Sequence, residues 1–469
     1  MMIRFSVDPT VQKRQVLGTQ GLFLRPGLTK IRFGNRVVQG VVQFAASNRQ
    51  GVKVVKTADE GPLLRISSQL QKALRLPVEG NIHLAPDGET WRLGPCLGIY
   101  VTRERNEQRM FGEQTRMLEE LTQYGNERGI DVVVLTPGFV GDERGWRFDP
   151  RTGKWELSQT TVPDIILRRS GRFHEPATKV NADLRAFQQA GRLHSLPRNS
   201  SNKWTFYRVM EENAKLRRYV PATMKVASWQ QLKIALARLK DAYLKPINGA
   251  QGICIHRLYL ETPKVIRVLK EERVVPREAD RLSTHFQPET KVVTDRLQSN
   301  AEIEAFWKSI QGQFRQWVLQ ESVSLLHTRD DRPVDFRWLV QYTDAPLVVG
   351  RVARVGLPGA ITTNIHTGGQ AMQARTALER LPDIDVKQIL ADMDNLALSV
   401  FEQLRDAFGP FAEVGIDIGV DESGRVLAFE VNPTPGRRML RSLPDNVREL
   451  SLLTLVEYAI RAAGFGNGK

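Results

Sequence analysis

Residues 414–432 read VGIDIGVDESGRVLAFEVN, and this stretch carries the strongest structural signal in the chain. Its first half alternates apolar residues with Asp417, as a strand does, and residues 421–424 (DESG) are typical of a turn. The second half is expected to return as a paired strand with Glu430 and Asn432 on one face, diagonally across from Asp417. The pattern therefore predicts a β-hairpin that presents three oxygen-bearing side chains on the same face.

The side chains on this face indicate which ligand they would hold. Two carboxylates and one amide are hard oxygen donors, which suit Mg²⁺ and leave positions for water and phosphate oxygens. We therefore expect Asp417, Glu430 and Asn432 to bind Mg²⁺. The alternative is a surface hairpin with ordinary polar residues on its solvent face, and the hairpin alone does not decide between the two.

The composition is typical of a globular protein with several domains. The chain has 469 residues, of which 41% are hydrophobic and 25% are charged. No apolar stretch approaches the roughly 20 residues of a membrane-spanning helix, and the N-terminus lacks the apolar core of a secretory signal. Cys96 and Cys254 lie far apart in the sequence, which fits a reducing, cytoplasmic compartment. The histidines lack the spacing of a zinc site, so we expect no zinc enzyme.

The net charge of +15 favours polyanionic partners, among them nucleotide phosphates, nucleic acid and anionic surfaces. The N-terminal part lacks the RNP, zinc-finger and basic-zipper signatures of a nucleic-acid module, so we do not expect nucleic acid as a partner. A solvated basic surface is the simpler interpretation of the charge.

The order of predicted elements indicates a multidomain protein of mixed α+β and α/β type. Residues 1–93 contain short strand-like runs between turns and predict a small β-rich domain. Residues 94–201 alternate strand, helix and strand, which predicts a Rossmann-like unit, although no GxGxxG follows its first strand. Residues 202–469 hold the remaining elements, and their charged stretch 262–300 predicts an insertion or an exposed ribbon.

A lysine and a glycine-containing loop precede the hairpin. Lys245 ends the predicted strand AYLKP, and the loop NGAQG (248–252) follows it, while Lys203 opens a predicted helix. Glycines let backbone N–H groups approach phosphate closely, and lysines add positive charge. The alternatives are a Gly-containing hairpin turn and a lone surface lysine, and the spacing is not a Walker A motif. The candidates for phosphate binding are Lys203, Lys245, Gly249, Gln251 and Gly252.

The predicted strand WVLQESV (317–323) ends in polar residues. Its edge would offer backbone groups to a purine ring, and Glu321 would reach a ribose hydroxyl. The candidates at this edge are Gln320, Glu321 and Val323.

Arginines follow on two further predicted strands. Asp335 and Arg337 alternate on one face of DFRWLV, and Arg351 and Arg354 lie on and just past the next strand. Arginines that converge with carboxylate-bound Mg²⁺ would neutralise a transferring phosphoryl group. The alternative for each arginine is a solvated strand edge. A polar loop with Asn364 comes next.

The order of these elements resembles the ATP-grasp superfamily over residues 203–440. The resemblance rests on the lysine and glycine loop, the strand-end glutamate, the DxR run, the arginine, the TN…GG loop and the spacing D-x₁₂-E-x-N. At the level of the whole chain, the sequence resembles the YheC/YheD group, which is linked by name to the bacterial endospore coat. This second resemblance is carried by LGPCLGIYVTRERN, NSSNKWTFYRVM, YLKPINGAQGICI, DFRWLVQY, RVGLPGAITTNIHTGG and GIDIGVD…FEVNPTPGR. Cys254 departs from the pattern, because the loop of many relatives has glycine there.

The resemblance implies a pre-ATP-grasp domain at 94–201 and a two-lobed ATP-grasp domain at 202–469. ATP would lie between the two lobes with its adenine at the 318–323 hinge, and Arg337 and Arg354 would stabilise an acylphosphate. The implied metal ligands are Asp417, Glu430 and Asn432. The implied ATP-binding residues are Lys203, Lys245, Gly249, Gln251, Gly252, Gln320, Glu321, Val323 and Asn364.

The leading hypothesis is therefore an ATP- and Mg²⁺-dependent ligase that joins a carboxylate to an amine. A second hypothesis is a non-catalytic nucleotide-binding protein that assembles on a spore coat or another polyanionic surface. A third is a phosphotransferase that uses the same site without an amine acceptor. Arg437 and Arg438 are candidates for the acceptor pocket, with ordinary surface polarity as the alternative.

Overall fold

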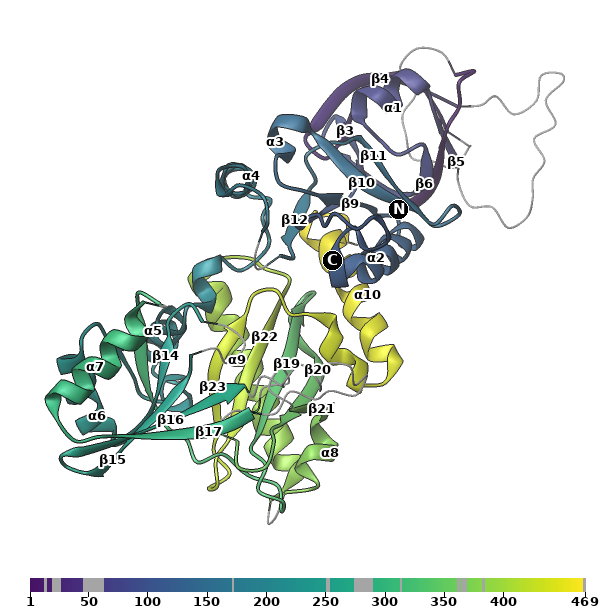
Figure 1. Cartoon of the computed structure of the whole chain (residues 1–469). Helices are drawn as coiled ribbons and strands as arrows, with labels where there is room; N and C mark the ends of the chain where they lie inside the picture. The colour runs from purple at the N-terminus through teal and green to yellow at the C-terminus, as the bar shows by residue number, and fades with distance from the viewer. Residues whose placement is uncertain are drawn as a thin grey trace, which may run out of the picture. The chain divides into compact units, whose positions relative to one another are not determined.

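The computed structural model describes residues 1–11, 15–18, 27–44, 63–170, 173–249, 254–273, 290–312, 314–360, 363, 369–381 and 384–466. The chain forms two compact units (Figure 1). The first unit contains residues 1–195, 342–345 and 449–469, and the second contains residues 196–341 and 346–448. The boundaries expected after residues 93 and 201 stay a prediction.

The first unit begins with a closed β-barrel of strand order β1-β5-β2-β4-β3-β7-β6. Its elements are β1 (Met2–Val7), β2 (Gln15–Gly18), β3 (Gly27–Phe33), β4 (Arg36–Phe44), β5 (Leu63–Ile66), α1 (Ser68–Leu74), β6 (Glu79–Asp87) and β7 (Thr90–Gly94). Residues that alternate along the strands, such as Ile3 and Phe5 on β1, point into the core. The expectation of a β-rich N-terminal part is confirmed.

A second sheet in the same unit has the order β11-β10-β9-β8-β12. Its elements are β8 (Cys96–Tyr100), α2 (Thr115–Glu127), β9 (Asp131–Leu135), α3 (Phe139–Asp142), β10 (Arg144–Asp149), β11 (Lys154–Gln159), β12 (Ile165–Arg168) and α4 (Ala177–Gln189). Strand β8 pairs in parallel with both β9 and β12, which confirms the predicted alternation of strand, helix and strand in an α/β unit. The last helix of the chain, α10 (Asp445–Ala462), belongs to this unit from Glu449 onward.

The hairpin β10–β11 is an element that the sequence reasoning missed. Its strands pair in antiparallel register from Arg144↔Gln159 to Asp149↔Lys154, and Gly153 adopts the positive φ of 66° that the turn requires. Most of its side chains stay partly exposed, so it lacks the apolar run that marks a buried strand. The alternation of polar and apolar residues in KWELSQ was the available signal.

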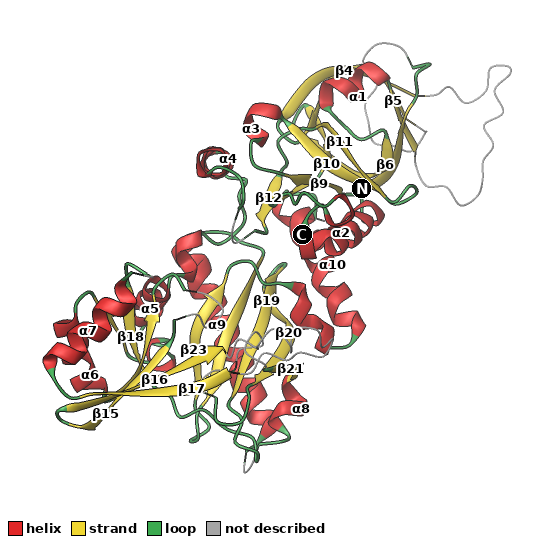
Figure 2. Ribbon diagram, in the orientation of Figure 1, coloured by secondary structure: helices red, strands yellow, loops and turns green. Residues whose placement is uncertain are grey.

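The second unit contains two sheets (Figure 2). The first has the order β13-β18-β14-β15-β16-β17, and helix α6 packs on it. Its elements are α5 (Lys203–Glu212), β13 (Thr223–Val226), α6 (Trp229–Leu239), β14 (Asp241–Pro246), β15 (His256–Thr262), β16 (Val265–Arg273), β17 (Thr290–Leu297), α7 (Asn300–Gln311) and β18 (Trp317–Glu321). Within the charged stretch predicted as a ribbon, the described residues include β16 and β17, which pair in antiparallel register, with β17 at the edge of this sheet.

The other sheet of this unit has the order β21-β20-β19-β22-β23, and helix α9 covers one of its faces. Its elements are β19 (Val334–Tyr342), β20 (Pro346–Val355), β21 (Gln370–Gln373), α8 (Ala374–Leu378), α9 (Val386–Phe408), β22 (Glu413–Val420) and β23 (Val426–Asn432). A short 3-10 helix, Arg437–Ser442, follows β23 and packs against β20 and β21.

Asp394 on α9 anchors two strands of this sheet. Its carboxylate accepts a hydrogen bond from Trp338 Nε1 (2.7 Å) on β19 and a bidentate pair from Arg351 (2.7 and 2.8 Å) on β20. The Trp338 side chain is fully buried, so its indole N–H has no access to water as a substitute acceptor. Arg351 was expected among the arginines of the site, and this expectation is wrong, because its side chain points to α9.

Replacing Asp394 with alanine should loosen the sheet. Asp394→Ala leaves a buried indole N–H and a guanidinium without their acceptor, which should lower the free energy of unfolding by about 2–3 kcal/mol. The measurement is the opening free energy of the β19 and β20 amides from hydrogen exchange. Asp392→Ala on the same helix removes only an exposed hydrogen bond with Gln388 and is the control. Equal effects of the two variants would contradict the anchoring role.

Candidate active site

The hairpin β22–β23 forms as the sequence predicts. Asp421 accepts backbone hydrogen bonds from Ser423 and Arg425 (3.0 Å each), and Gly424 has a φ of 81°. Asp417 pairs directly with Glu430 rather than diagonally, because the ladder shifts by one residue between Asp417 and Ile418.

Asn432 lies across from Gly415, so its side chain shares the face of Asp417 and Glu430. The three expected oxygen donors therefore come together on one side of the hairpin. Phe429 is the extra residue of the bulge, and its ring lies over Gly419, where a Cβ atom would come within 2.4 Å of it. Gly419 is therefore required for this packing.

A chain of four charged side chains crosses the sheet at this face. Arg337 on β19 donates to both oxygens of Asp417 on β22 (2.5 and 2.6 Å). Arg354 on β20 donates to both oxygens of Asp335 (2.6 Å each) and also to Oδ2 of Asp417 (2.9 Å). The order Asp335–Arg354–Asp417–Arg337 alternates in sign, so each buried charge has an opposite neighbour.

Pairing with the two arginines keeps the Asp417 carboxylate ionised. Asp417 is only 3% exposed. Burial alone raises its pKa, but Arg337 and Arg354 overcome that effect and lower the pKa to about 2. Burial lowers the pKa of Arg354, but Asp335 and Asp417 raise it well above its usual range, so the Arg354 guanidinium stays charged at every physiological pH.

Lys203 is the first residue of helix α5, and its side chain reaches the hairpin. Its Nζ lies 3.0 Å from Glu430 Oε2 and donates to the carbonyl oxygen of Gly249 (2.7 Å). Burial raises the pKa of Glu430, but the ammonium of Lys203 lowers it below its usual value. Lys203 thus joins the hairpin β22–β23 to the start of the glycine-containing loop.

Lys245 lies at the end of β14, as predicted. Its Nζ donates to Gln320 Oε1 (2.8 Å), and it faces the rings of Tyr243 (5.2 Å) and Phe429 (5.9 Å). Loss of hydration is the largest effect on this lysine and lowers its pKa to about 8. Gln320 is buried and also donates to Thr223 Oγ1 (3.1 Å), so its side chain positions Lys245.

The other predicted contacts of the purine edge are at the surface. Strand β18 ends at Glu321, earlier than predicted, and the exposed carboxylate of Glu321 accepts a hydrogen bond from the Ala222 amide (3.2 Å). Val323 lies just beyond the strand. Gln251, Gly252 and Asn364 lie outside the described residues.

Arg437 does not belong to an acceptor pocket. Its guanidinium is buried and pairs with Glu413 (2.5 Å), whose carboxylate also accepts a hydrogen bond from Gln341 (3.0 Å). The sequence interpretation is therefore wrong here, because the arginine neutralises a buried carboxylate.

The donor set on the hairpin fits Mg²⁺. Asp417 has about four acceptor positions, of which the arginines use three, and Glu430 is partly exposed. Asn432 accepts one hydrogen bond from the Thr434 amide (3.0 Å) and keeps a second acceptor position. Among the described residues, no group of three or more His, Cys, Asp or Glu offers an alternative metal site.

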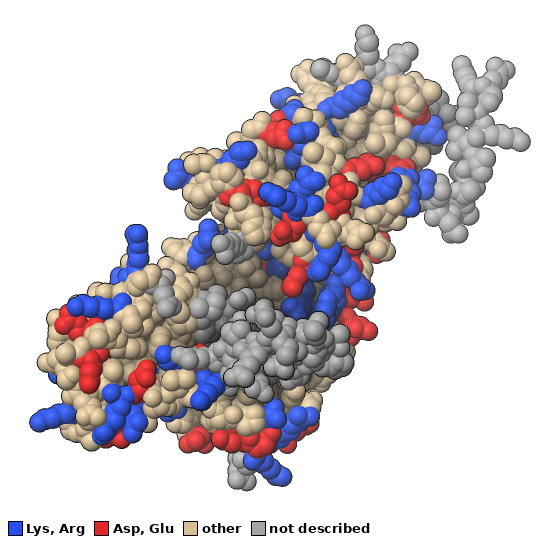
Figure 3. Space-filling view, in the orientation of Figure 1, with Lys and Arg blue, Asp and Glu red and all other residues tan. Residues whose placement is uncertain are grey.

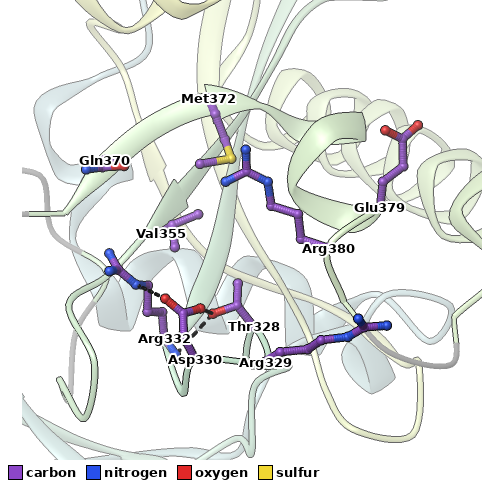
Figure 4. A pocket seen from close by; sticks show the side chains of 9 residues that line it. All are labelled: Thr328, Arg329, Asp330, Arg332, Val355, Gln370, Met372, Glu379 and Arg380. Atoms are coloured by element: carbon purple, nitrogen blue, oxygen red, sulfur yellow. Dashed lines mark hydrogen bonds and ion pairs between the residues drawn. The ribbon is translucent and has the colours of Figure 1, made fainter.

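A pocket of about 520 Å³ lies on the opposite face of the same sheet (Figure 4). Its lining residues are Thr328, Arg329, Asp330, Arg332, Val355, Gln370, Met372, Glu379 and Arg380. Arg354 points toward Asp417, so Val355, the next residue on the strand, points the other way. The pocket is therefore separate from the ion-pair cluster.

Three residues that contribute to the site were absent from the sequence-based site. Asn202 caps α5 by accepting hydrogen bonds from the amides of Trp204 and Thr205, and its Nδ2 donates to Asn248 (3.2 Å). An asparagine just before a predicted helix was the available signal. No local sequence signal marks Tyr243 and Phe429, because their contact with Lys245 depends on the packing of two sheets.

Comparison with known protein families identifies the family of this chain. A model of the YheC/D-like ATP-grasp family matches residues 195–461, and the chain belongs to this family. The chain is 23% identical to the endospore coat-associated protein YheC of Bacillus subtilis over 341 residues, which cover 71% of this chain and 88% of that protein. It is also 23% identical to YheD of the same organism over 450 residues, 92% of this chain and 90% of that one.

Solved structures with a similar chain path include the ATP-grasp ligase PsnB complexed with minimal precursor, Mg and ADP. The identity is 13%, the match covers 78% of this chain and 97% of that chain, and the TM-score is 0.43. The VanG D-Ala:D-Ser ligase of Enterococcus faecalis is 11% identical over 79% of this chain and 99% of that one, with a TM-score of 0.44. The family assignment rests on the family model. None of the helices among the described residues has the length and apolarity to cross a membrane.

Protonation of Asp417 should appear in the acid stability of the protein. The folded pKa of about 2 lies below the value of about 3.9 for an unfolded Asp. The pairing therefore contributes roughly 2–3 kcal/mol above pH 4, and this contribution is lost as the pH falls through 2. Urea unfolding of Asp417→Asn in EDTA should show lower stability at pH 7 and a shallower loss between pH 4 and 2.

The matched control is Asp406→Asn, which changes an exposed carboxylate on α9 and should follow the wild-type pH dependence. Parallel curves for wild type and Asp417→Asn over this range would show that the carboxylate is not held ionised by its arginines.

Proposed function

We propose that the chain is an ATP- and Mg²⁺-dependent ligase that joins a carboxylate to an amine through an acylphosphate. The observation that carries the proposal is the convergence of Lys203, Lys245, Arg337 and Arg354 with Asp417 and Glu430 in one place. Such an array suits a triphosphate and a transferring phosphoryl group, because both carry several negative charges. Membership of the ATP-grasp family supports the same function.

Lys203 and Lys245 would bind the α- and β-phosphates, and residues 248–252 would cover them. Gln320, Glu321 and Val323 would lie beside the nucleoside, with Asn364 near the phosphates. Mg²⁺, held by Asp417, Glu430 and Asn432, would neutralise charge on the β- and γ-phosphates. The residue types match these roles, and no covalent enzyme intermediate is required.

The reaction has two displacements. A carboxylate oxygen of the substrate attacks the γ-phosphorus, the bond to the β-phosphate oxygen breaks, and ADP leaves. The amine nitrogen then attacks the acyl carbon, loses a proton, and inorganic phosphate leaves as the amide forms. The protein supplies position and charge to both steps.

Arg337 and Arg354 are suited to hold the acylphosphate. Each uses Nε and Nη2 to bind a carboxylate, and among the described residues neither Nη1 donates a hydrogen bond. The carboxylates fix the plane of each guanidinium, so the remaining N–H groups are oriented before any substrate binds. Preorganised donors stabilise developing charge without reorganisation.

A second proposal concerns location and is based on the names of the relatives. Two Bacillus subtilis relatives are described as endospore coat-associated, which favours a role in the spore coat, with or without catalysis. On the face drawn in Figure 3, Lys and Arg alternate with Asp and Glu over the visible surface. The ligase proposal is preferred, because the clustered cations and carboxylates described above suit a triphosphate directly.

Removing the charge of Glu430 should stop the reaction. Glu430→Gln keeps the shape of the side chain but removes a metal-binding carboxylate and the partner of Lys203. ADP release, screened against amino acids, dipeptides and polyglutamate-type acceptors, should fall by at least about 100-fold, as expected for loss of several kcal/mol of charge stabilisation. Glu402→Gln, an exposed change on α9, is the control. ADP release at the parental rate from Glu430→Gln would disprove the assigned site.

Nucleotide affinity should depend on the charge of Lys245. Because burial lowers the pKa of this lysine to about 8, the free protein loses the charge as the pH rises. If only the protonated form binds, the Kd for Mg-ATP should rise by about tenfold between pH 7 and 9. Lys245→Arg keeps its charge over this range and should remove the rise.

Isothermal titration calorimetry provides the measurement. Exposed Lys215→Arg should follow the wild-type curve. A wild-type affinity that stays constant to pH 9 would mean that Lys245 does not bind the phosphates as an ammonium.

A further inference from the structure

Lys203 lies at the centre of the contacts between α5, the loop and the hairpin. Its Nζ bridges Glu430 Oε2 (3.0 Å) and the Gly249 carbonyl oxygen (2.7 Å), and its backbone amide donates to the Ile247 carbonyl oxygen (3.1 Å). Its side chain is 10% exposed, so this contact is largely shielded from solvent. The ammonium is therefore a fixed part of this site.

Glu430 is the more accessible of the two carboxylate donors on the hairpin. Both oxygens of Asp417 already accept hydrogen bonds from arginines, and Asn432 accepts one from Thr434. The Glu430 side chain is 35% exposed, compared with 4% for Asp417. A divalent cation would therefore approach through Glu430, where Lys203 already lies.

The charges around Glu430 do not favour the binding of a divalent cation without a nucleotide. Four cationic side chains, Lys203, Lys245, Arg337 and Arg354, accompany three carboxylates, Asp335, Asp417 and Glu430. The cluster is thus net positive before any ligand binds, and a divalent cation alone would increase that charge. A triphosphate supplies the missing negative charge, because it offers Lys203 and Lys245 anionic partners of their own.

We propose that Lys203 is a resident cation that excludes free Mg²⁺ from Glu430, and that the site admits the metal only together with nucleotide phosphates, which draw the ammonium away. This inference rests on the proposed function, since it assumes that the hairpin holds a metal. It adds that the species that binds is the metal–nucleotide complex rather than either component alone.

The contact between Lys203 and Gly249 also links metal binding to the loop. When Lys203 leaves Glu430, its bond to the Gly249 carbonyl also changes, so metal entry is coupled to the root of the loop at residues 247–249. Coupling between two ligands is reciprocal. The metal should therefore raise nucleotide affinity by the same factor as the nucleotide raises metal affinity.

Mn²⁺ is a suitable probe, because its binding is read by electron paramagnetic resonance without any turnover. In wild type, Mn²⁺ should bind the nucleotide-free protein at least about tenfold more weakly than it binds in the presence of a non-hydrolysable ATP analogue, a coupling in the usual range for linked sites. Lys203→Met should tighten nucleotide-free Mn²⁺ binding by at least about tenfold. Lys203→Arg, which keeps a cation, should not.

Two controls test whether the gain in Mn²⁺ affinity arises at Lys203 and Glu430. Lys215→Met removes an exposed lysine and should leave Mn²⁺ binding unchanged. Adding Glu430→Gln to Lys203→Met should abolish the gain, because the metal then loses its entry ligand. Circular dichroism checks that each variant is folded.

The outcomes separate this inference from the proposed function. If wild type fails to bind the ATP analogue with Mn²⁺, the proposed function is wrong, and the inference falls with it. If the analogue binds but Lys203→Met gains no Mn²⁺ affinity, the resident-cation inference alone is overturned. Equal Mn²⁺ affinity of wild type with and without the analogue also overturns it, and this comparison needs no variant.

Discussion

The pairing of buried Asp417 with Arg337 and Arg354 is the constraint on which the rest of this site depends. A buried carboxylate without a partner would cost about 3–5 kcal/mol, so the three strands that carry these residues must be in register. That register places Glu430 and Asn432 beside Asp417 on the neighbouring strand. A single electrostatic requirement therefore aligns β19, β20, β22 and β23.

The same pairing explains how a cationic site tolerates its own charge. Asp417 lies between the two arginines, and the bidentate pairs with Asp335 and Asp417 fix the planes of the guanidiniums, so their mutual repulsion is reduced. The two lysines lie in environments that differ from those of the arginines. Lys245 is desolvated beside two aromatic rings, and Lys203 is neutralised by Glu430. The lysines that we propose to bind phosphate lack bidentate partners, whereas bidentate pairs hold the arginines in a fixed orientation.

Sequence reasoning succeeded where the signal was local. Alternation and turn residues predicted the hairpin at 414–432, and the strand ahead of Lys245 was found in the same way. It failed where the partner was distant in sequence, as for Arg351, which pairs with Asp394, and for Arg437, which pairs with Glu413. The direct pairing of Asp417 with Glu430 was missed because a bulge changes the register by one residue.

The sequence by itself determined the residue types, the strands that carry them and the face on which each side chain projects. Only the tertiary structure decided which charges meet, because Lys203, Asp335, Arg354 and Asp417 come from four elements separated by long stretches of chain. Strand periodicity fixes a direction for a side chain but not the neighbour that it finds there. The neighbour is set by the packing of two sheets, and packing depends on the burial of the whole unit rather than on any local pattern.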